Sequence, residues 1–133
     1  MANGKTMTGG CLCGALRYEA RPDPDTAYCC HCRDCQIGSG SAFHAGVFAD
    51  LSSFRVLSGE TATYSKVADS GNRIDRIFCP NCGTPVYWTG EKFPEQVILT
   101  VSSLDKPESI VPVREIWTHR AMPWSRIRED LES

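Results

Sequence analysis

The sequence predicts a mainly β fold with little helix. Three observations lead to this prediction: short β-type runs recur along the chain, Gly, Pro, Asp, Asn and Ser separate them, and no repeat or low-complexity segment interrupts the pattern. Runs of this kind are typical of strands, and the residues between them are those that set turns. Nine strands are expected, at residues 15–20, 26–30, 42–48, 54–58, 61–67, 73–78, 85–88, 96–101 and 113–117.

The strand that includes residues 97–99 has the clearest signal, since Val-Ile-Leu is continuously apolar and too short for a core helix. It is expected to be buried on both faces. Helix is expected only as a short turn after Cys32 and as a last helix over 125–131, opened by Pro123. A chain of 133 residues has the length of one domain. We expect a loose tail over 1–7 and a single domain over 8–133.

Composition argues against several classes of protein. A net charge of -2 lacks the basic excess of a nucleic-acid binder, and no apolar run approaches the roughly 20 residues that span a membrane. The first eight residues contain no apolar segment typical of a signal peptide, so a cytoplasmic location is expected. In a reducing compartment the eight cysteines are not expected to form disulfides, which leaves metal ligation, catalysis or buried thiols.

Two cysteine pairs predict one structural zinc site. Residues two apart in an extended segment point the same way, so Cys11 and Cys13 can reach one metal while Leu12 points into the core. Cys79 and Cys82 form a Cys-x-x-Cys turn that offers two more sulfurs. Structural zinc takes four ligands, and the two pairs complete each other. The alternative is four unrelated buried thiols.

A third group, Cys30, Cys32 and Cys35, has the composition of a catalytic zinc site. Strand alternation puts Cys30 and Cys32 on one face, and one turn can return Cys35 to it. Three protein ligands with an open fourth position are typical of catalytic zinc. Two other interpretations stay open: reduced thiols that line a pocket without permanent metal, and a redox pair of Cys32 with Cys35.

The residues next to this group have less specific signals. Cys29 and His31 alternate with the ligands in a strand, so Cys29 is expected as a core thiol and His31 as a hydrogen-bonded or surface group, not a fourth ligand. His44 could act as a base, although a half-buried histidine with satisfied hydrogen bonds is the simpler interpretation. His119 is expected in solvent. Residues 38–41 (Gly-Ser-Gly-Ser) are either a flexible turn or a set of free amides that seat an anionic peptide such as glutathione.

Three sequence blocks together resemble the glutathione-dependent formaldehyde-activating enzyme family, which includes centromere protein V. They are residues 9–18 (GGCLCGALRY), 30–35 (CHCRDC) and 78–84 (FCPNCGT), and residues 115–118 (EIWT) and 123–124 (PW) fit the closing motif of that family. The resemblance implies a β-tent fold of several coiled antiparallel sheets pinned by the four-cysteine zinc site. It also implies the division of ligands: Cys11, Cys13, Cys79 and Cys82 hold the structural zinc, and Cys30, Cys32 and Cys35 hold a catalytic zinc.

The expected activity is that of a zinc-dependent carbon–sulfur lyase that acts on adducts of glutathione, or a similar thiol, with formaldehyde or a related small aldehyde. The expected partners are these small molecules, with neither nucleic acid nor membrane. The second zinc is expected to be the more labile of the two. The alternative is a non-enzymatic, zinc-stabilised module that binds a partner or senses thiols or metal.

Overall fold

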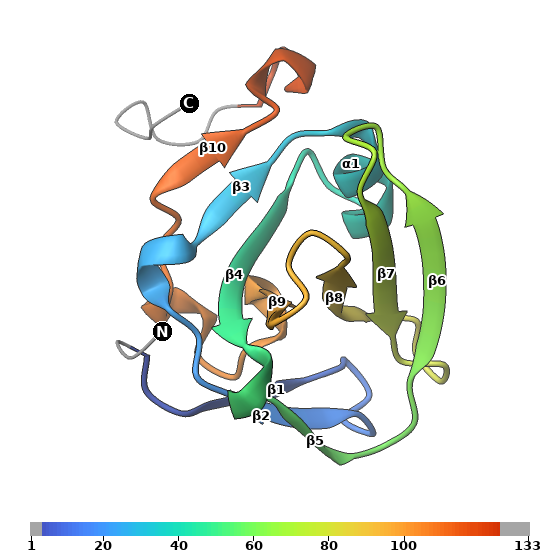
Figure 1. The fold of residues 1–133 in the computed structure, drawn as a ribbon, viewed down its shortest axis with the longest axis vertical. Coiled ribbons are helices and arrows are strands. Elements are labelled where there is room, and N and C mark those ends of the chain that lie inside the picture. Colours follow the sequence, from blue (N-terminus) through green and yellow to red (C-terminus); the bar gives the residue numbers. More distant parts are fainter. Residues whose placement is uncertain (1–3, 126–133) are drawn as a thin grey trace.

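A computed structural model describes residues 4–125 and shows a mainly β fold with two sheets and one short α-helix. The smaller sheet has three antiparallel strands in the order β1-β2-β5, formed by Met7–Gly10, Arg17–Ala20 and Arg55–Ser58. It lies at the end of the molecule away from the helix α1 (Arg33–Ser39) (Figure 1).

The larger sheet has seven strands in the order β10-β3-β4-β9-β8-β7-β6. It curls so that β3 and β4 face β7 and β6 from the other side of the fold (Figure 1). All its pairs are antiparallel except β10 with β3. The strands are β3 (Tyr28–Cys30), β4 (His44–Asp50), β6 (Ala62–Val67), β7 (Arg73–Phe78), β8 (Pro85–Gly90), β9 (Gln96–Thr100) and β10 (Arg114–Ile116).

Short 3-10 helices connect several strands, and α1 begins directly after Cys32 as predicted. The sulfur of Cys32 caps this helix by accepting the N–H of Cys35 at 3.4 Å. Among residues 4–125 no helix is both long and apolar enough to cross a membrane. The 3-10 helices are Pro24–Thr26, Leu51–Ser53, Val101–Ser103, Pro107–Ser109 and Thr118–Arg120.

All nine predicted strands are present, with small shifts at their ends, but β1 was not predicted. Its sequence, Met-Thr-Gly-Gly, has little intrinsic preference for a strand. Met7, which the sequence places in the tail, pairs with Ala20, and a Cβ at Gly9 would lie 2.6 Å from the Tyr18 hydroxyl. Tertiary packing therefore makes this strand. The predicted helix over 125–131 falls almost entirely outside the described residues.

The main core lies between the two sheets and contains Val97 and Leu99, whereas Ile98 belongs to a second buried cluster, and all three are fully buried as predicted. Tyr18 is also fully buried, and its hydroxyl hydrogen-bonds the Ser103 hydroxyl at 2.6 Å. Burial raises the pKa of Tyr18 to about 12. The uncharged phenol therefore joins β2 to the segment that follows β9.

Candidate metal centres

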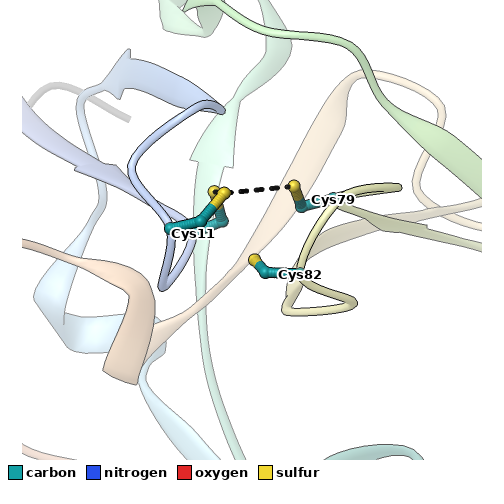
Figure 2. Close-up of side chains that lie close together, drawn as sticks. Cys11, Cys79 and Cys82 are labelled. Atoms are coloured by element: carbon teal, nitrogen blue, oxygen red, sulfur yellow. Dashed lines mark hydrogen bonds between the residues drawn. The ribbon is translucent and has the colours of Figure 1, made fainter.

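The structure brings the sulfurs of Cys11, Cys13, Cys79 and Cys82 to within 4.8 Å of one another. Two of the separations are 3.6 Å, between Cys11 and Cys13, and 3.9 Å, between Cys13 and Cys79. A tetrahedral zinc site with Zn–S bonds near 2.3 Å has edges of about 3.8 Å. Figure 2 shows the sulfurs converging from two loops, one between β1 and β2 and one between β7 and β8. The donor set therefore fits one zinc ion.

The environment of this cluster favours thiolates at Cys11 and Cys82, whose pKa values are lowered, whereas desolvation and the Cys11 and Cys82 sulfurs raise the pKa of Cys79 to about 11. The N–H of Leu16 donates to the Cys11 sulfur at 3.2 Å, and the Asn81 amide donates to Cys13 at 3.3 Å. Hydrogen bonds from Thr84 lower the pKa of Cys82 to about 5. Metal ligands are commonly oriented by such neighbours. This cluster of Cys11, Cys13, Cys79 and Cys82 is called the closed cluster below.

Strand alternation predicted that Leu12 would point into the core, and this prediction is wrong. The Leu12 side chain is 89% exposed. The residues after β1 form a turn, in which Gly14 donates to the Cys11 carbonyl at 3.1 Å, so strand alternation does not apply there. The two sulfurs still share a site because the turn itself converges on it. The Leu12 N–H also donates to the Thr84 hydroxyl at 3.1 Å, which joins the two loops.

The second cluster consists of Cys30, Cys32 and Cys35, whose sulfurs also lie within 4.8 Å of one another. Cys30 ends β3, Cys32 caps α1 and Cys35 lies in its first turn. The three sulfurs thus come from a single strand–helix junction. Because all the described cysteines are free thiols, the structure contains no Cys32–Cys35 disulfide. This group is called the open cluster below.

The three thiols of the open cluster share their charge unequally. Contacts with the Cys30 and Cys35 sulfurs lower the pKa of Cys32 to about 2, whereas the contact with Cys32 raises the pKa of Cys30 to about 11. The pKa of Cys35 is raised as well, by the Cys30 and Cys32 sulfurs. One thiolate forms easily, and three together require a cation among them. The donor set therefore fits a bound metal ion with three protein ligands.

A cavity of about 510 Å³ opens beside the open cluster, and all three of its cysteines line that cavity. Its walls contain five aromatic side chains: Tyr28, Phe48, Trp88, Phe93 and Trp117. Two aspartates and two arginines add charge to the lining. The volume lies within the range of small-molecule sites, about 300–1,000 Å³. The open cluster therefore faces a space in which a ligand can bind.

Positive charge is available in this cavity. Arg76 on β7 and Arg114 on β10 line it, and within residues 4–125 neither has a carboxylate at ion-pair distance. The two lining aspartates are engaged, Asp34 with Lys66 at 2.6 Å and Asp69 with Arg120 at 3.9 Å. The contacts with the other two sulfurs lower the pKa of Cys32 the most, and the positive charge of Arg76 lowers it further. The site thus favours an anion beside the cysteines.

The three histidines behave differently from one another. His31 is buried and its Nε2 lies 2.8 Å from a carboxylate oxygen of Glu115, which ties the strand–helix junction to β10, so it is a hydrogen-bonded group as expected. His44 is almost fully buried, and burial lowers its pKa to about 4. The Trp88 indole N–H donates to its Nε2 at 3.4 Å, so this nitrogen is already engaged. His119 is exposed, and its ring centroid lies 5.3 Å from that of Trp117.

Residues 38–41 do not offer free amides for an anionic peptide. Gly38 and Ser39 belong to α1, and Gly40 ends it in the left-handed conformation, with φ 65°. The amides of Gly40 and Ser41 donate to the Gln36 carbonyl. They are therefore used to close the helix.

Two features of the site were not predicted. Arg76 had no signal in the sequence, because its position depends on how β7 folds over the cysteines. Trp117 has a φ of 57°, the only positive φ of a described non-glycine residue. Such a conformation is an outlier for a bulky side chain and is retained where surrounding structure holds it. It places Trp117 in the cavity wall beside the open cluster.

Cys29 was expected to be a core thiol, and the structure confirms that it is buried.

Comparisons with known proteins agree with this geometry. The family described as glutathione-dependent formaldehyde-activating enzyme matches residues 6–120. An uncharacterized lyase of Schizosaccharomyces pombe is 36% identical over 80 residues, which cover 60% of this chain and 55% of that protein, so the match spans about half of its length. The crystal structure of a Rhodobacter sphaeroides protein superposes with a TM-score of 0.66 at 24% identity, covering 82% of this chain and 99% of the other, and shares the fold. The chain belongs to the glutathione-dependent formaldehyde-activating enzyme family.

Proposed function

We propose that the protein is a zinc-dependent carbon–sulfur lyase that acts on adducts of glutathione, or a similar thiol, with a small aldehyde such as formaldehyde. The observation that carries this proposal is the pairing of three cysteines with a ligand-sized cavity. The family description and the name of the yeast relative support it. In this proposal the closed cluster holds a structural zinc and the open cluster holds a catalytic one.

A zinc ion held by Cys30, Cys32 and Cys35 would lower the pKa of an entering thiol and stabilise its thiolate. In the direction of addition, a bond forms between the thiol sulfur and the carbonyl carbon, and the thiol proton ends on the former carbonyl oxygen. The lyase direction breaks the same C–S bond and returns the proton to sulfur.

The residues of the chain contribute charge and exclusion of water. Arg76 favours the anionic form of a sulfur beside Cys32, and the aromatic walls keep water away from it. His44 is a poor base at neutral pH, because its pKa of about 4 and its contact with Trp88 leave little basicity. The thiol proton is therefore expected to pass to solvent or to the substrate oxygen and not to His44.

The direct test is turnover of the zinc-loaded protein with glutathione and formaldehyde, measured by NMR exchange between free and thiol-bound aldehyde. Acceleration above the uncatalysed rate supports the proposal. Binding of the thiol adduct without acceleration would favour the non-enzymatic module.

Arg76→Gln is expected to lower kcat/KM by about tenfold or more, because it removes the positive charge beside the reacting sulfur. Arg73→Gln is the matched control. It removes the same charge from the same strand, but Arg73 pairs with Asp75 and does not line this cavity. Equal losses in the two variants would show that only the overall charge matters.

Mild chelation is expected to remove zinc from the open cluster first. Its three ligands lie within six consecutive residues and face a cavity, whereas the closed cluster takes four ligands from two distant loops. Loss of zinc from the open cluster should leave the melting temperature nearly unchanged. Metal analysis combined with a thermal melt checks this, and early loss from the closed cluster would reverse the assignment.

A further inference from the structure

The cavity is much larger than the smallest substrate of the proposed reaction. Formaldehyde is little bigger than a water molecule, which takes about 30 Å³ in the liquid, whereas the cavity measures about 510 Å³. A one-carbon unit held at the cysteines would leave the aromatic walls untouched. Glutathione would fill part of this volume, so which group the reacting carbon can carry depends on the lining next to the cysteines.

The space next to the open cluster is aromatic. Cys30 and Cys35 form one buried apolar cluster with Tyr28 and Ile98, and Phe48, Trp88 and Trp117 pack against it. From there the aromatic surface continues outward. The ring centroids of Tyr28 and Phe48 are 5.9 Å apart, and those of Phe48 and Phe93 are 5.2 Å apart. A substituent on the reacting carbon would contact this wall directly.

The polar lining includes groups from other segments. Asp69, Ser70 and Asn72, between β6 and β7, and Arg114 on β10 line the cavity in addition to Arg76 and Asp34. Glutathione has two carboxylates and one ammonium group, which suit such polar and cationic groups and not an aromatic wall. The polar groups thus suit the peptide half of an adduct, which leaves the aromatic wall for the carbonyl half.

We infer, on the basis of the function proposed above, that the substrate carbon bound to sulfur carries an aromatic or bulky apolar group. The preferred carbonyl partner is then an aromatic or large aliphatic aldehyde, and formaldehyde is a slower substrate of the same reaction. Addition forms the same C–S bond as with formaldehyde, and the thiol proton again ends on the former carbonyl oxygen.

Binding of two unreactive thioethers tests this inference without turnover. S-benzylglutathione and S-methylglutathione share the same peptide and differ only in the group on the sulfur-bound carbon. Calorimetry on the zinc-loaded protein is expected to show the benzyl compound binding about tenfold more tightly or better, since a phenyl ring buries far more apolar surface than a methyl group. Equal affinities, or no binding of either compound, would overturn the inference.

Phe93→Ala tests where the preference arises. Phe93 is 37% exposed at the outer end of the aromatic wall, so its truncation should not unfold the protein. The benzyl preference is expected to fall about fivefold. Leu57→Ala is the control, because Leu57 is 47% exposed on β5, outside the cavity lining, and should leave the preference unchanged. A preference undiminished in Phe93→Ala contradicts the placement on this wall.

Turnover separates this inference from the proposed function. With glutathione as the common thiol, benzaldehyde should give a higher kcat/KM than formaldehyde. A benzyl binding preference without turnover of either aldehyde would support the cavity preference and refute the lyase. Turnover that is fastest with formaldehyde would support the lyase and overturn the inference.

Discussion

Cys79→Ser is expected to leave the protein unfolded or insoluble. In zinc-finger peptides the binding of structural zinc contributes roughly 10–16 kcal/mol of folding free energy, whereas a whole domain is stable by about 5–15 kcal/mol. Serine cannot replace the thiolate, and Cys79 is only 1% exposed, so its hydroxyl would also be buried. Loss of this one ligand therefore removes most of the stability.

A matched control exists within the chain. Cys29 is likewise 1% exposed, but it belongs to neither cluster. Cys29→Ser makes the same chemical change at the same burial, and it is expected to cost about 1–3 kcal/mol. Thermal melts and soluble yield of the two variants measure the difference. If Cys79→Ser melted like Cys29→Ser, the closed cluster would have no structural role.

Cys32→Ser is expected to abolish turnover while the fold survives. It removes one ligand of the open cluster, and the loss in kcat/KM should be about 100-fold or more. Stability should change little, because Cys32 is the N-cap of α1 and serine is among the preferred residues there. A metal bound at this cluster would also lie at a site that does not hold the rest of the fold together.

The measurement combines a melt, a metal count and turnover on one preparation. Ile37→Ser is the control, since Ile37 is on the same helix but 65% exposed and outside the cavity lining. It should match the wild type in all three measurements. Unchanged turnover in Cys32→Ser would remove the open cluster from catalysis.

Much of the site was predictable because the cysteines that could bind metal occur in short motifs. The spacings of Cys11 with Cys13 and of Cys79 with Cys82 predicted two pairs, and the tetrahedral requirement of zinc predicted that they meet. The strand–helix junction at Cys32 was predictable for the same local reason. The exposure of Leu12 was not, because strand alternation was applied to a residue that lies in a turn.

The rest of the site depends on long-range packing. Arg76, Trp117 and Phe93 lie in three different segments and meet only when the seven-stranded sheet curls. A single sequence contains no local signal for such a meeting. The strand β1 was missed for a similar reason, since its glycines favour no regular structure until Gly9 packs against Tyr18 and Gly10 against Arg17.

The spacing of the closed cluster also has a consequence for how the chain folds. Cys13 and Cys79 lie 66 positions apart, so a bound metal closes a long loop, which in a disulfide of that span is worth about 4 kcal/mol of unfolded-state entropy. Before the loop closes, each short motif is a partial chelator by itself. The unfolded chain can complete a tetrahedron by combining Cys79 and Cys82 with thiols of the open cluster instead of Cys11 and Cys13. We therefore expect metal that binds before the sheets form to create wrongly cross-linked states that must dissociate, so zinc added early should slow folding and zinc added late should complete it.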